Sequence, residues 1–88
     1  MRFKHILLKT PLLIDQVILS LRQGADFSAL AREHSACPSA KNGGEIGEIE
    51  ADDLPKAIQL VLRDLPLNEV SQPVYTHHGI HIIQLEAV

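Results

Sequence analysis

The sequence contains few aromatic residues and almost no cysteine. Among its 88 residues are two phenylalanines, one tyrosine and no tryptophan, although 45% of all residues are hydrophobic. The core must therefore be mostly aliphatic, and a chain of this length has room for one small domain, residues 1–88. The single cysteine, Cys37, excludes an internal disulfide framework.

Clusters of positive charge and long hydrophobic runs are also missing. Eight lysines and arginines stand against eleven aspartates and glutamates, and the formal net charge is -3. The absence of a basic stripe argues against nucleic acid as the main partner. No apolar run has the length of a membrane span or the form of a secretory signal. We therefore expect a cytoplasmic protein with no membrane partner, and we expect it to be a monomer.

Two segments at opposite ends of the chain have the alternating pattern of strands. His5 lies on the apolar face of the segment 3–8, and His81 lies on the apolar face of the segment 79–87. A small chain has one core, and a buried imidazole needs partners for both ring nitrogens. We therefore expect the two histidines to lie on adjacent strands, with ring nitrogens about 2.7–3.2 Å apart.

Capping residues, prolines and apolar spacing predict the elements between these strands. In chain order we expect a strand over 3–8, a helix over 11–23 capped by Thr10, a helix from Asp26 to about Cys37, a strand over 45–49, a helix after Asp52 or Asp53, a turn region over 65–72, and strands over 73–76 and 79–87. The very short link between the last two strands indicates an antiparallel hairpin. The order β-α-α-β-α-β-β predicts an α+β domain with an antiparallel sheet.

Five short segments carry a resemblance that extends over essentially the whole chain. They are His5-Ile6-Leu7-Leu8-Lys9-Thr10, Gly24-Ala25-Asp26-Phe27-Ser28-Ala29-Leu30-Ala31, Ser35-Ala36-Cys37-Pro38-Ser39, Gly43-Gly44-Glu45-Ile46-Gly47 and Gly79-Ile80-His81-Ile82-Ile83. Their order and spacing make the chain resemble the parvulin family of peptidyl-prolyl cis/trans isomerases. The resemblance implies a four-stranded antiparallel sheet wrapped by three to four helices. It also implies isomerisation of X-Pro bonds in peptides and unfolded protein segments, in assistance of folding and without a cofactor.

The resemblance also implies which residues form the site. The catalytic positions are His5, Cys37, Thr76 and His81, and the substrate-binding positions are Leu54, Ile58 and His78. Leucine keeps the volume of the family's methionine at Leu54. Ile58 and His78 replace aromatic rings that would pack on proline, and this change affects the expected efficiency more than the fold. The link after the first strand is too short for the basic loop of the phosphate-directed branch, so we expect no preference for phosphorylated peptides.

Each assignment has a structural alternative. A histidine on a strand is usually a core residue, and Leu54 and Ile58 are ordinary core residues. Cys37 is a candidate nucleophile beside histidine, but aspartate at this position in family members favours an electrostatic, non-covalent role.

Two other functions compete with the isomerase. The substituted pocket positions suggest a peptide-binding or chaperone module with weak isomerase activity. A weaker alternative is a metal site built from His34, Cys37, His77 and His78, which lack the paired spacing of zinc ligands.

Overall fold

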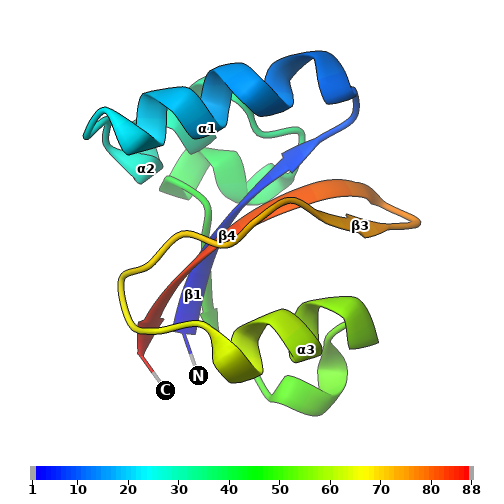
Figure 1. Cartoon of the computed structure of the whole chain (residues 1–88). Coiled ribbons are helices and arrows are strands. Elements are labelled where there is room, and N and C mark those ends of the chain that lie inside the picture. The colour runs from blue at the N-terminus through cyan, green and yellow to red at the C-terminus, as the bar shows by residue number, and fades with distance from the viewer. Residues whose placement is uncertain (1, 88) are drawn as a thin grey trace.

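Strand β1 (Arg2–Leu8) occupies an inner position in a four-stranded antiparallel sheet with the order β2-β1-β4-β3 (Figure 1). The computed structural model describes residues 2–87. The other elements are α1 (Ile14–Arg22), α2 (Phe27–His34), β2 (Glu45–Glu48), α3 (Lys56–Asp64), β3 (Val74–Thr76) and β4 (Gly79–Ala87), with short 3-10 turns η1 (Pro11–Leu13), η2 (Pro38–Asn42) and η3 (Ala51–Asp53). The α+β class and the antiparallel sheet expected from the sequence are confirmed.

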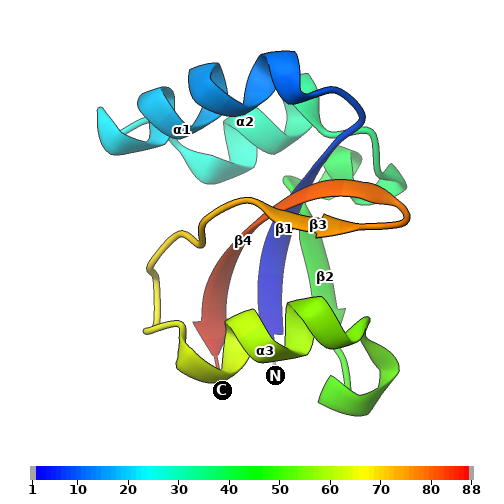
Figure 2. The same ribbon diagram turned by 45° about the vertical axis from the view of Figure 1, so that its right-hand side comes forward.

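Helices cover both faces of the sheet. Helices α1 and α2 lie on one face and α3 lies on the other (Figure 2). Alternation along the central strands supplies an apolar layer to each face, because successive side chains of a strand point to opposite sides. Ile6 and Ile82 belong to the core cluster under α1 and α2, whereas Phe3 and Ile83 belong to the cluster under α3. The aliphatic core thus has two halves separated by the sheet.

The register of β1 against β4 places the two histidines on one face. His5 pairs with Ile83, and Leu7 pairs with His81. The two imidazoles are therefore diagonal neighbours on the face that α3 covers. Both are buried, with exposed fractions of 8% and 6%. The expected placement of the histidines on adjacent strands is confirmed.

The starts of the helices differ from the expectation in two places. Thr10 accepts a hydrogen bond from the Leu12 amide, but it caps the short turn η1, and α1 begins only at Ile14. Asp52 and Asp53 lie in η3, and α3 begins at Lys56 after Pro55. Pro11 is the first residue of η1 and Pro55 directly precedes α3. The fixed φ of proline suits both positions at the start of a helical segment.

Two further boundaries depend on contacts that are distant in sequence. Helix α2 begins as expected after Asp26, whose carboxylate accepts from the Ala29 amide, but it ends at His34. Ser35 is extended, and its hydroxyl accepts a hydrogen bond from the Leu7 amide at 3.0 Å. Helix α2 is therefore shorter than the prediction that ended it near Cys37, because Ser35 and Ala36, which follow it, form hydrogen bonds with Leu7 of β1.

The loop after η2 comes very close to β1. The His5 amide donates to the Gly44 carbonyl at 3.0 Å. A Cβ atom at Gly44 would lie 2.5 Å from the His5 carbonyl oxygen, and Gly44 has a φ of 85°. Glycine is required here because no side chain fits and the backbone is left-handed. This close approach brings η2 beside His5.

Candidate active site

The two buried histidines contact each other through their ring nitrogens. Nδ1 of His5 lies 3.4 Å from Nδ1 of His81, slightly beyond the expected range. The rings are stacked, with centroids 5.5 Å apart and an interplanar angle of 25°. Phe3 meets the edge of His5 at a centroid distance of 6.5 Å. The pair therefore borders the apolar cluster under α3.

A hydroxyl group lies at each end of the histidine pair. Nε2 of His5 is 3.2 Å from the hydroxyl of Ser39, and Nε2 of His81 is 2.8 Å from the hydroxyl of Thr76. The Thr76 oxygen also accepts from the His78 amide at 3.2 Å. The result is a chain of four side chains, Ser39–His5–His81–Thr76, in which every ring nitrogen has a partner. The predicted contact of Thr76 with one histidine is confirmed.

This chain of hydrogen bonds forms completely when both imidazoles are neutral. A neutral imidazole has one donor and one acceptor nitrogen. If His5 donates through Nδ1, Ser39 donates to its Nε2 and His81 donates to Thr76. If His81 donates through Nδ1, all three bonds reverse. In either direction one terminal hydroxyl keeps a proton that it can donate to a ligand.

The electrostatics of the site favour these neutral forms. Burial, with a smaller contribution from His81, lowers the pKa of His5 from 6.5 to about 4. Burial also lowers the pKa of His81, and the nearby charges of His78 and Lys9 add to this effect. A cation is disfavoured inside the apolar layer because it loses its hydration. Both histidines are therefore neutral at neutral pH.

Cys37 lies in the segment between α2 and η2 and is half-buried. Its backbone amide donates to the Ser35 hydroxyl at 3.4 Å, and its carbonyl accepts from the Ala40 amide at 2.9 Å. Within residues 2–87, no hydrogen bond joins the Cys37 sulfur to a histidine nitrogen. A nucleophile activated by histidine typically has that contact.

The three predicted substrate-binding residues differ greatly in exposure. Ile58 is only 3% exposed and belongs to the core cluster with Phe3 and Ile83. Leu54 is half-buried against the same cluster. His78 is exposed in the β3–β4 turn, where its ring lies 4.0 Å from that of His77. Leu54 and His78 are accessible to a ligand, whereas Ile58 offers little surface, and the binding role of all three remains a prediction.

Comparison with known proteins identifies the family. A family model described as the rotamase PPIC-type PPIase domain matches residues 5–87. The chain belongs to the PPIC-type PPIase family. It is a peptidyl-prolyl cis/trans isomerase domain with the parvulin fold.

Curated relatives of this PPIC-type domain include proteins named for folding. The chain is 41% identical to a chaperone SurA from Methylobacillus flagellatus, over 93% of the chain and 21% of that protein. It is 36% identical to a foldase protein PrsA from Caldanaerobacter subterraneus subsp. tengcongensis, over 100% of the chain and 29% of that protein. The chain thus spans less than a third of the length of these relatives.

Solved structures share the PPIC-type fold closely. PrsA from Bacillus subtilis matches with a TM-score of 0.93 and 31% identity, covering 100% of this chain and 35% of that one. The parvulin domain of PpiD from E. coli matches with a TM-score of 0.81 and 31% identity, covering 98% and 84%. The parvulin resemblance proposed from sequence motifs is confirmed.

One member of the PPIC-type site was missed by the sequence reasoning. Ser39 was not among the expected site residues, although it lies in η2 with its hydroxyl near His5. The available signal was the Cys37-Pro38-Ser39 motif next to the two glycines that draw the loop onto β1. The competing metal site has no geometric support, since residues 2–87 contain no group of three potential metal ligands. No helix of the described part is long and apolar enough to span a membrane.

Proposed function

We propose that this domain isomerises X-Pro bonds in peptides and unfolded protein segments at the His5–His81 site and thereby assists folding. The observation that carries the proposal is the series of hydrogen bonds Ser39–His5–His81–Thr76, whose two histidines are buried and neutral on the face under α3. The chaperone and foldase names of the relatives support the assistance of folding. We further propose that residues 1–88 act as one domain and as a monomer.

The chemistry requires no proton transfer and no covalent intermediate. Resonance in the X-Pro amide creates a rotation barrier of about 18–20 kcal/mol. In the twisted transition state this resonance is lost, and the carbonyl oxygen gives up part of its negative charge. A site accelerates the rotation when it stabilises the twisted amide more than the planar one. An apolar, dehydrated pocket around the proline ring and the carbonyl meets that requirement.

The residues of the site divide these tasks. We propose that Leu54 and His78, with the edge of Ile58, contact the proline ring. His5, His81 and Thr76 form a rigid, uncharged base of the site. The hydroxyl of Thr76 or Ser39 that keeps its proton can donate a hydrogen bond to the substrate amide. Cys37 lies near the reacting carbonyl and acts through its partial negative charge. The missing contact between its sulfur and a histidine supports this non-covalent role.

An exchange experiment tests the proposal. Two-dimensional NMR exchange spectroscopy on a panel of X-Pro tetrapeptides measures isomerisation directly, without a coupled protease. We expect catalysed exchange, and we expect no advantage for phosphoserine or phosphothreonine before proline. Binding without faster exchange would instead support the peptide-binding or chaperone module with weak isomerase activity.

We propose the cytoplasm as the location of the protein. The proposal rests on the lack of an apolar run of signal or membrane length in the sequence. Fractionation of cells that produce the natural, untagged protein tests it, with periplasmic, membrane or extracellular recovery as the contrary result.

A further inference from the structure

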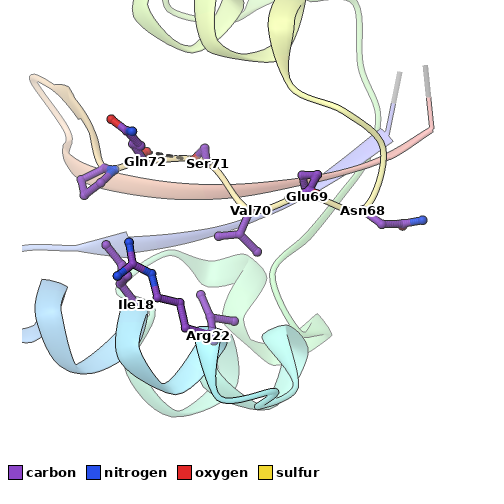
Figure 3. A pocket seen from close by; sticks show the side chains of 9 residues that line it. Ile18, Arg22, Asn68, Glu69, Val70, Ser71 and Gln72 are labelled. Atoms are coloured by element: carbon purple, nitrogen blue, oxygen red, sulfur yellow. Dashed lines mark hydrogen bonds between the residues drawn. The ribbon is translucent and has the colours of Figure 1, made fainter.

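A groove of about 530 Å³ lies between α1 and the chain segment that precedes β3 (Figure 3). Its walls are Ile18, Leu21 and Arg22 of α1 and the segment 68–73. Ile18, Leu21 and Val70 pack against the core cluster under α1 and α2. The histidine pair lies on the opposite face of the sheet, so this groove is a separate feature.

The segment 68–71 continues the β3 edge of the sheet along β4. The Asn68 amide donates to the Leu85 carbonyl at 2.7 Å, and the Ser71 amide donates to the Ile83 carbonyl at 2.8 Å. Between them, Val70 forms an antiparallel bridge with Gln84. Neighbouring residues of a strand direct their amide and carbonyl groups to opposite edges. The Val70 groups therefore point away from β4, and no hydrogen bond to them is found within residues 2–87.

An edge strand beside a helix is a known arrangement for binding extended peptides. The peptide adds a strand to the sheet, and its alternate side chains contact the helix and the strand. Here the apolar contacts are Ile18 and Leu21 on the helix and Val70 on the edge. All three are half-buried, so each retains surface for a ligand.

The charges of the groove give it a direction. Figure 3 shows the guanidinium group of Arg22 toward the Gln72 end and Glu69 toward the other end. Both residues are exposed, and within residues 2–87 neither has an ion pair. An extended segment with opposite charges at its two ends complements this arrangement.

We propose that this groove binds an extended, proline-free segment of a client protein as an added strand. An acidic side chain of the segment lies near Arg22, a basic one lies near Glu69, and apolar side chains between them contact Ile18, Leu21 and Val70. The inference rests on the proposed function in that the clients are unfolded protein segments. A second binding site would hold a client while its prolines reach the histidine site.

Two capped peptides, KTVTVTE and ETVTVTK, test the proposal, and in both the charged ends and the valines lie on the same face of an extended strand. They have the same composition and opposite charge order, and neither contains proline. Titration into ¹⁵N-labelled protein should shift the amide signals of Ile18, Leu21 and Val70 and leave those of His5 and His81 unchanged. One peptide should bind about threefold or more tightly than the other, since two exposed ion pairs are made or lost. The preferred order also gives the direction of the added strand.

Charge reversal provides the decisive variant. The double variant Arg22→Glu with Glu69→Lys should exchange the order of preference between the two peptides. It should retain the dispersed amide spectrum of the folded domain, because both side chains are exposed. A peptide with N-methyl groups at its paired amides should lose binding. Unchanged preference in the double variant, or tight binding of the methylated peptide, would refute the added strand.

The remaining outcomes are also distinguishable. Sedimentation that shows dimers, with the same three amides shifting on dilution, would assign the edge to a second copy of this chain and overturn the proposal. Exchange catalysis on a short prolyl peptide is measured separately. Its absence would refute the isomerase activity without changing the peptide titration, and normal catalysis without peptide shifts would refute only the groove.

Discussion

His5 and His81 lie on adjacent strands with their Nδ1 atoms 3.4 Å apart, and burial lowers the pKa of both. The fold therefore tolerates neutral imidazoles and opposes their protonation. In the unfolded chain the pKa of His5 returns to about 6.5. The pair thus links stability to pH in a direction that can be calculated.

Acidification should destabilise the protein between pH 6.5 and about 4. The folded pKa of His5 is about 4, below its unfolded value, so the unfolded state binds more protons in this range. The stabilisation from neutral His5 is fully present above pH 6.5. It is lost as the pH falls from 6.5 to about 4, and the free energy of unfolding decreases by about 3 kcal/mol in total. Urea unfolding at several pH values measures it. His5→Asn should reduce the slope of the free energy of unfolding against pH, and the exposed control His77→Asn should not. A pKa of His5 above 6.5, measured by NMR, would contradict this explanation.

Removal of the Ser39 hydroxyl, which bonds to His5 at one end of the hydrogen-bonded series, should destabilise the fold and reduce catalysis. Ser39→Ala leaves Nε2 of His5 buried without a partner, which costs about 1–3 kcal/mol. We expect a lower free energy of unfolding, a lower kcat and a changed ¹⁵N shift of the His5 ring. Ser20→Ala on α1 is the control. Equal effects of the two variants would mean that Ser39 has no special contact.

The sequence predicted the parts of the fold that depend on local patterns. Alternating residues gave β1 and β4, and the Asp26 carboxylate caps α2 as expected. The parts that were missed depend on contacts between distant segments. The segment 65–72 has the composition of a turn, yet Val70 pairs with Gln84 and packs its side chain against the core cluster under α1 and α2. No local pattern contains that pairing.

The site was predictable to a similar extent. The two histidines could be paired because a small core brings distant apolar faces together. Ser39 could not be found in this way, because its position depends on how closely Gly44 approaches the His5 carbonyl. The exposure of Ile58 also could not be read from residue type, since isoleucine is equally common in a core and in an apolar pocket.

Enlarging Ile58 should destabilise the protein without improving catalysis. Ile58 is 3% exposed among Phe3, Leu62 and Ile83, so Ile58→Phe overpacks the core and costs about 1–3 kcal/mol. Leu54 is only half-buried, and methionine conserves its volume and apolarity. Leu54→Met should therefore leave the free energy of unfolding nearly unchanged and change kcat/KM by about twofold or less. Thermal unfolding and exchange rates measured on both variants test this. A clear gain in kcat/KM for Ile58→Phe without loss of stability would show that this position contributes more than its edge to the proline pocket.

Glu86 should make an opposite contribution to the pH dependence. Its pKa is raised by burial first, and then by a hydrogen bond to Glu45 and the charge of that residue, against smaller effects of Lys4 and Arg2. A raised folded pKa gives stability that is complete below the unfolded value and lost as the pH rises through the folded one. Glu86→Gln should therefore raise the free energy of unfolding at pH 7 and have little effect at pH 4. The exposed control Glu50→Gln should show no such difference, and a destabilised Glu86→Gln at pH 7 would reverse the sign of the argument.

Two substitutions at Cys37 separate the electrostatic mechanism from a covalent one. An anion beside the amide oxygen destabilises the planar amide more than the twisted form, because the planar oxygen carries more negative charge. Cys37→Asp should therefore retain much of the activity, whereas Cys37→Ala should lose most of it. A covalent mechanism predicts that both variants are inactive, since a carboxylate replaces a thiolate nucleophile poorly. Exchange spectroscopy on folded variants measures the rates, and mass spectrometry of the protein with bound peptide detects adducts. A folded but inactive Cys37→Asp, or an adduct on the Cys37 sulfur, would establish the covalent route.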